Sequence, residues 1–229
     1  MKLKKIASLM LAGVMAVSML AGCKDGGNSN SGSSSENTNT NTGYSAILEE
    51  KAADALYKAE RDKVFTFADN ADDQKALAAA SLNLDDTLIE TWVKANVLAK
   101  SVNEITMLSD FSDKAKLDRQ AKDGLLNGDK TFVSNLQPAN TVKVGEVWAV
   151  NGTTNLDVAL EKIFDTYKSA FEKAPKSGTL NASNGQTTEY NYSYTVSVSV
   201  VNVPARSNLE FSGSVNLVAV TVTRTGTAA

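Results

Sequence analysis

The sequence predicts an α+β fold in which an N-terminal group of helices is followed by a small antiparallel β-sheet packed on an amphipathic helix. Two patterns and their order support this prediction. Apolar residues recur at helical spacing between residues 45 and 122, whereas apolar and polar residues alternate from residue 190 onward. The helices precede the strands instead of alternating with them, which argues against a doubly wound parallel sheet.

The N-terminal helices are marked by periodic apolar residues and by capping signals. A helix is predicted over residues 45–63, and Val64–Phe67 then breaks the pattern and is expected to be extended. Asn70 is placed to cap a helix over residues 71–82. The apolar stripe of the first helix consists of Leu48, Ala52, Ala55, Leu56 and Ala59.

The next predicted helix begins at a capping box formed by Thr87 and Glu90. Its apolar face continues to Ile105, and a more polar helix over residues 112–122 is expected to end at Gly124. The apolar face contains Leu88, Trp92, Ala95, Ala99, Val102 and Ile105.

Beyond residue 130 the pattern changes to strands. Residues 131–136 and 141–150 are predicted strands, and the second has one apolar face on which Glu146 is the exception. Thr154 and Asp157 mark the start of an amphipathic helix that Pro175 stops. Its core stripe consists of Leu156, Leu160, Ile163, Phe164, Tyr167 and Phe171.

Two long strands follow a Gly/Ser/Asn loop at residues 176–185, with a turn at 204–208 between them. Both strands change phase near this turn, for example at Val201 and Val203. Either a β-bulge or an end buried on both faces explains the change. The alternate face is lined with Ser, Thr and Asn, and is a candidate polar binding surface or edge for strand addition.

The N-terminus has the order of an export signal. Three lysines precede an apolar run over residues 6–20, and Leu20-Ala21-Gly22-Cys23 ends it with small residues and the only cysteine. These four residues resemble the lipobox of bacterial lipoproteins. The resemblance implies cleavage between Gly22 and Cys23 and a diacylglycerol on the Cys23 thiol, which would tie the chain to the lipid bilayer. The alternatives are an ordinary secretory signal with an incidental cysteine, or a single membrane-spanning anchor.

The chain is therefore expected to divide into a signal peptide (1–22), a lipidated and flexible tether (23–43), a helical region (44–126) and an α+β region (127–229). The last two are expected to form one compact domain. The tether is almost entirely Gly, Ser, Asn and Thr and contains no large apolar residue, so it is expected to stay unfolded. Tethers of this composition favour a Gram-positive cell membrane, with the protein on the extracytoplasmic face.

Composition restricts the partners. Without residues 1–22 the chain has 20 basic and 26 acidic residues, a net charge of −6. Nucleic acid is therefore not expected as a partner, because phosphate binding needs concentrated positive charge. An envelope protein or a cell-wall polymer is the expected partner.

The residues present exclude much catalytic chemistry. The chain has no histidine and one cysteine, which removes Ser-His-Asp and Cys-His catalysis and histidine-ligated zinc. No cofactor, metal or catalytic residue is predicted. Carboxylates remain, and six are interpreted as helix caps, with a glycosidase pair or a calcium site as alternatives: Asp72, Asp73, Asp85, Asp86, Asp110 and Asp113. The oxygen-rich turn from Asp123 to Asp129 is interpreted as a solvated turn, with a calcium site as the alternative.

Tyr190, Tyr192 and Tyr194 lie on one strand face and form the candidate ligand-binding or partner-binding site. Their rings are suited to stacking on sugars or gripping a partner. The alternative is that they continue a valine face into the core, as Trp92 and Trp148 are expected to do on their own elements.

These observations favour a non-enzymatic binding or interaction module, anchored by lipid in the bacterial cell envelope. Two alternatives remain open. One is a carboxylate-based hydrolase of envelope glycan, which needs two acids facing one cleft. The other is a solute-capture lipoprotein of a transporter.

Overall fold

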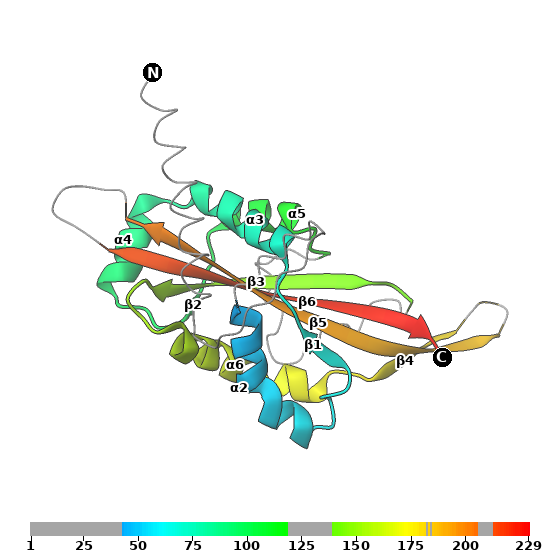
Figure 1. The fold of residues 1–229 in the computed structure, drawn as a ribbon. Coiled ribbons are helices and arrows are strands. Elements are labelled where there is room, and N and C mark those ends of the chain that lie inside the picture. Colours follow the sequence, from blue (N-terminus) through cyan, green and yellow to red (C-terminus); the bar gives the residue numbers. More distant parts are fainter. Residues whose placement is uncertain (1–42, 119–138, 182, 184, 206–212) are drawn as a thin grey trace, which may run out of the picture.

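The computed structural model describes residues 43–118, 139–181, 183, 185–205 and 213–229 (Figure 1). The helices are α2 (Tyr44–Lys58), α3 (Ala71–Ala80), the 3₁₀ turn η1 (Ser81–Asn83), α4 (Asp86–Lys94), α5 (Ile105–Lys114) and α6 (Leu156–Lys173). The strands are β1 (Phe65–Phe67), β2 (Lys100–Ser101), β3 (Val142–Asn151), β4 (Ser177–Asn181), β5 (Thr187–Pro204) and β6 (Ser214–Ala228). The lipobox with Cys23, the tether, the acidic turn at 123–129 and the predicted strand at 131–136 lie outside the described residues.

The strands form one mixed sheet in the order β1-β5-β6-β3-β2, with β4 also paired with β5. Its centre is the antiparallel hairpin of β5 and β6, which runs from Tyr190 opposite Ala228 to Pro204 opposite Ser214. Only β1 pairs in parallel among the described strands. Together with the helices that precede and flank it, this sheet confirms the α+β class.

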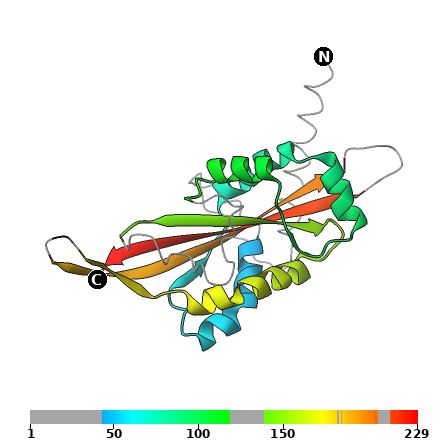
Figure 2. The ribbon, with the colours of Figure 1, turned by 180° about the vertical axis from the view of Figure 1, so that it is seen from behind.

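Helices cover both faces of the sheet, so the sheet is the middle of three layers (Figures 1 and 2). Helices α2 and α6 pack on one face, and α3, α4 and α5 pack on the other. The sheet is therefore larger than the small sheet on a single helix that the sequence predicts. The helices bury Leu48, Leu56, Leu160, Ile163 and Phe171 on the first face and Leu77, Ile89, Trp92, Met107 and Phe111 on the second.

This three-layer arrangement explains the change of phase near the hairpin turn. The register of β5 and β6 is continuous, without a bulge. Val200 packs toward α2 and α6, whereas Val201 and Val203 are buried on the opposite face with α3 and α4. Of the two explanations, an end buried on both faces is the correct one.

The helix predicted to run from Thr87 to Ile105 is wrong at both ends. Its cap is Asp85, whose carboxylate accepts the Thr87 amide at 2.7 Å. The helix ends at Lys94, because Asn96 takes a left-handed conformation (φ 48°) and Val97 N–H donates to the Trp92 carbonyl. The chain then extends as β2.

The helix predicted over residues 112–122 is also misplaced. The carboxylate of Glu104 accepts two backbone amides at the start of α5, so this helix begins at Ile105 and ends at Lys114. Two other boundaries are closer to the prediction. Asn70 caps α3 through the amides of Asp72 and Asp73, and Asn155, one residue after the predicted Thr154, caps α6.

β1 pairs with only part of the β5 edge, and side chains of α2 and α3 bind the backbone of β5 further along that edge. The amide of Gln74 both donates to the Val200 carbonyl (2.8 Å) and accepts the Val200 N–H (3.0 Å). The hydroxyl of Ser45 accepts the Val198 N–H at 3.0 Å. These contacts use the backbone groups that strand addition would need, so this part of β5 is closed to a partner strand. None of the helices in the described ranges is long and apolar enough to cross a bilayer.

Candidate functional site

The tyrosines of β5, predicted as a candidate binding site, are not exposed as a binding surface. Tyr192 is 6% exposed and Tyr194 is 1% exposed, and Tyr190 is half-buried against the same core. The Tyr194 ring stacks on Phe65 with centroids 4.7 Å apart, and the guanidinium of Arg224 lies 4.4 Å above the Tyr192 ring. The tyrosines therefore continue the valine face into the core, and Tyr192 and Tyr194 offer no ring to a ligand.

Two of the three predicted acidic pairs lie at helix starts. Asp72 and Asp73 are in the first turn of α3, and Asp85 and Asp86 begin α4. The capping interpretation is wrong for Asp110 and Asp113, which lie in the second half of α5, where Asp110 pairs with Lys114. Carboxylates at these places stabilise the positive end of the helix dipole or an adjacent cation. Over the described residues, no three acidic or cysteine side chains gather where they could hold a metal ion.

Glu146, the exception on the apolar face of β3, belongs to a buried polar cluster that the sequence does not reveal. Its carboxylate accepts from Ser101 Oγ (2.8 Å) and from the Tyr167 hydroxyl (2.9 Å), and Trp148 Nε1 donates to the same hydroxyl. Burial raises the pKa of Glu146, although both hydrogen bonds oppose this. Because both oxygens are engaged within the core, we interpret this cluster as structural.

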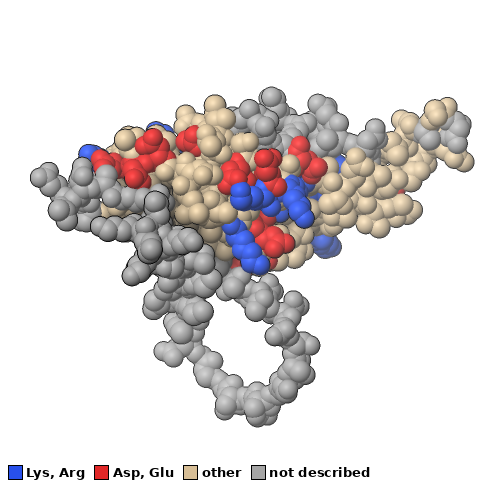
Figure 3. Space-filling view, turned by 90° about the horizontal axis from the view of Figure 1, so that it is seen from above, with Lys and Arg blue, Asp and Glu red and all other residues tan. Residues whose placement is uncertain are grey.

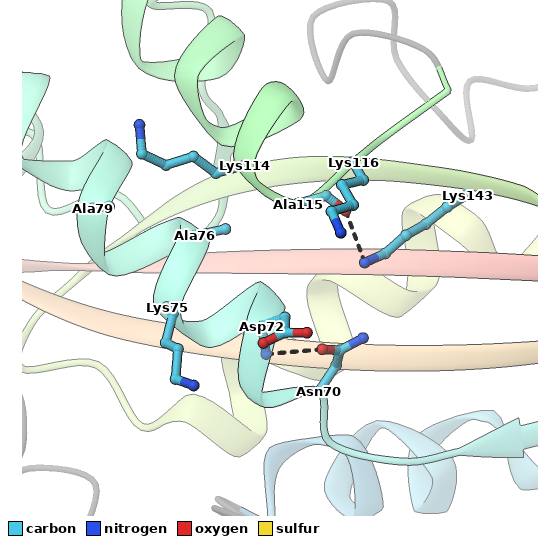
Figure 4. A pocket seen from close by; sticks show the side chains of 9 residues that line it. All are labelled: Asn70, Asp72, Lys75, Ala76, Ala79, Lys114, Ala115, Lys116 and Lys143. Carbon is cyan, nitrogen blue, oxygen red and sulfur yellow. Dashed lines mark hydrogen bonds between the residues drawn. The ribbon is translucent and has the colours of Figure 1, made fainter.

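A pocket of about 550 Å³ opens between α3, the end of α5 and β3 (Figure 4). We call it the lysine pocket. Lys75 on α3, Lys114 and Lys116 at the end of α5, and Lys143 on β3 line it, and Asp72 contributes the one carboxylate among the described lining residues. The ammonium groups of Lys116 and Lys143 point into the pocket (Figure 4).

Lys143 is held in place from beneath. Its ammonium pairs with Asp73, which is 1% exposed, and donates to the Ala115 carbonyl at 3.0 Å. The second oxygen of Asp73 accepts from Thr221 Oγ1 at 2.7 Å. An ammonium has three N–H donors, so one remains for a ligand after these two contacts. The lysine side chain is 17% exposed and lines the pocket.

Lys116 has an unfavourable backbone conformation. Its φ is 56°, in the left-handed region where glycine is usual at the end of a helix. The Leu117 N–H donates back to the Ser112 carbonyl at 2.9 Å and closes the helix end around it. A lysine at this position lines the same pocket as Lys143 at a cost in backbone energy.

The face of the sheet that carries Lys143 continues out of the pocket as an uncovered surface. Beyond the helices, β4 and the paired ends of β5 and β6 extend as an arm (Figures 1 and 2). The side chains of the arm on the α3 side are exposed, except for the half-buried Thr223. We call this set the open polar face: Ser177, Thr179, Asn181, Thr187, Glu189, Asn191, Ser193, Thr195, Thr223, Thr225 and Thr227.

The lysine pocket and the open polar face adjoin. Lys143 pairs across the strands with Thr223, and Thr223 pairs with Thr195. Figure 3 looks onto this side of the molecule, where charged side chains gather over the middle and uncharged side chains cover the arm. The polar face predicted on the last hairpin therefore exists, and it is open along the arm but buried under α3 at Ser197 and Ser199.

The sequence does not reveal the lysine pocket. Its lysines come from three elements spread over 69 residues, from Lys75 to Lys143, and no spacing motif joins them. One visible signal is Lys143, which with Glu146 is one of two charged residues in a strand of mostly small and apolar residues. No protein-family profile, curated protein or solved structure matches the chain.

Proposed function

We propose that this chain is a lipid-anchored protein on the extracytoplasmic face of a bacterial cell membrane, and that it binds an anionic ligand of the envelope without catalysis. The lysine pocket is the observation that carries the binding function. Four lysines from three elements line it, and two of them are paired with acids, Lys114 with Asp110 and Lys143 with Asp73. Lys75 and Lys116 lie outside these ion pairs, so they supply the positive charge that the pocket offers to an anion.

The lining of the pocket favours binding over hydrolysis. Glycoside hydrolysis uses two carboxylates on either side of the scissile bond. Among the described residues that line the pocket Asp72 is the one carboxylate, and the neighbouring Asp73 is buried and paired with Lys143. An ammonium fixed by a buried carboxylate is pre-organised, so less side-chain entropy is lost when an anion binds.

Titration of the detergent-solubilised full chain with inorganic triphosphate tests the binding function. We expect binding that weakens as salt is added, because exposed charges are screened. Lys116→Gln should weaken it about tenfold, the equivalent of one charged hydrogen bond. The matched control is Lys168→Gln, in the shallow groove between α2 and α6 where three lysines are balanced by four acids. Equal affinities for the two variants would overturn the proposal.

Membrane fractionation tests the anchor separately. Cys23→Ala should release the protein into the medium or leave the precursor uncleaved, because the thiol is the expected site of the diacylglycerol. Unchanged membrane association together with normal processing in this variant would contradict lipidation at Cys23.

A further inference from the structure

We infer that the lysine pocket and the open polar face act together as one surface, whose ligand is a polymer that carries both phosphate groups and free hydroxyls, of the polyol-phosphate type. This inference rests on the proposed function and names the class of ligand. It depends on the two regions lying side by side on one face of the sheet.

The pocket supplies the charged part of the surface. Lys116 and Lys143 direct their ammonium groups inward, while Lys75 and Lys114 stand at its rim (Figure 4). A phosphate diester has two free oxygens with one shared negative charge, and paired lysines bind such a group as point charges. The volume of about 550 Å³ exceeds what one phosphate needs, so the pocket also has room for the atoms attached to it.

The open polar face supplies uncharged hydrogen-bonding groups. Ten of its eleven residues are Ser, Thr or Asn, and Glu189 is the one charged member. Hydroxyl and amide side chains both donate and accept hydrogen bonds, so they match the hydroxyls of a polyol or sugar. A ligand of phosphate alone would leave this face unused.

The geometry joins the two regions in one line. Thr223 and Thr195 follow Lys143 across neighbouring strands, about 4.5–5.5 Å apart per strand step. A chain whose phosphate occupies the pocket can therefore lie directly across the arm. Without residues 1–22 the chain has a net charge of −6, which opposes long polyanions at a distance and favours a ligand whose charges are spaced by neutral groups.

The test compares two ligands with the same number of phosphates, short poly(glycerol phosphate) and inorganic polyphosphate, on the detergent-solubilised full chain. The variant Thr195→Val/Thr223→Val removes two hydroxyls and keeps side-chain shape. It should weaken poly(glycerol phosphate) binding about tenfold and leave polyphosphate binding unchanged. Thr188→Val, on the opposite face of the same arm, is the matched control and should change neither affinity.

The outcomes separate this inference from the proposed function. If Lys116→Gln weakens both ligands and Thr195→Val/Thr223→Val weakens neither, the pocket binds a simple anion and the extended surface is overturned. If Lys116→Gln changes neither affinity, the proposed function fails as well. A soluble short-chain phosphatidylglycerol that displaces poly(glycerol phosphate) at equal phosphate concentration would assign the site to a lipid headgroup and overturn the polymer.

Discussion

Replacing Lys143 with methionine should destabilise the protein strongly. The substitution leaves the Asp73 carboxylate, 1% exposed, with the Thr221 hydroxyl as its remaining partner among the contacts described above. An unpaired buried charge costs about 3–5 kcal/mol. Because the lysine side chain is 17% exposed, water can approach the vacated space, and we expect a loss near about 3 kcal/mol.

The double variant Lys143→Met/Asp73→Leu isolates the origin of this loss. Removing the carboxylate as well removes the uncompensated charge, so the double variant should recover most of the stability that the single variant loses. The control is Lys58→Met, which breaks an exposed pair with Asp54 and should change stability by no more than about 0.5 kcal/mol. Exposed pairs contribute little because water and salt screen them.

The assay is urea unfolding followed by tryptophan fluorescence. Trp92 and Trp148 are both buried, on opposite faces of the sheet, so the emission reports both layers of core. The free energies of unfolding of the variants and the wild type are compared, provided that the dependence of this free energy on urea concentration (the m-value) is unchanged. A loss below about 1 kcal/mol for Lys143→Met, or a double variant no more stable than the single one, would refute the buried ion pair as the support of the pocket.

Three further substitutions test other parts of the structure. Glu146→Gln should raise stability at about pH 8 and lose that advantage by about pH 4. Burial raises the pKa of Glu146 in the folded state, so the charged carboxylate destabilises the fold at a pH above this pKa. Below the pKa of Glu146 in the unfolded state the carboxyl is protonated in both states, and the penalty is absent. A difference in unfolding free energy that does not change with pH would contradict this. Gly178→Ala should lower stability by about 1–3 kcal/mol, because a Cβ would lie 1.8 Å from the Tyr192 hydroxyl oxygen, and an unchanged Tm would count against this packing. Lys116→Gly should gain up to about 1 kcal/mol by relieving the left-handed backbone while weakening triphosphate binding; if stability falls instead, the strain is not there.

The elements that local sequence predicts are those whose signals are complete within a few residues. Asn70 caps α3 as predicted, because an Asx cap needs only the next three amides. The stripe of α6 is buried as predicted except for the half-buried Leu156, and Pro175 follows its end. The alternation of β5 and β6 also predicts their pairing, since a side-chain period of two is diagnostic.

The predictions that fail depend on contacts between distant segments. The apolar pattern from Leu88 to Ile105 continues through the real end of α4, because Val102 is buried from an extended segment instead of a helix. The tyrosine pattern on β5 is the same for a surface and for a core, and its burial depends on α6 and β1 packing over it. The lysine pocket is formed by the tertiary fold alone, so no local pattern predicts it.

The most direct test of the central claim is a lysine ammonium NMR spectrum of the ¹⁵N-labelled full chain in detergent, recorded during titration with poly(glycerol phosphate). The ammonium signals of Lys116 and Lys143 should shift first and saturate together, while the signals of Lys58 and Lys168 on the opposite face stay in place. Shifts that are uniform over all lysines, or that spare Lys116 and Lys143, would contradict a selective anion site in the lysine pocket.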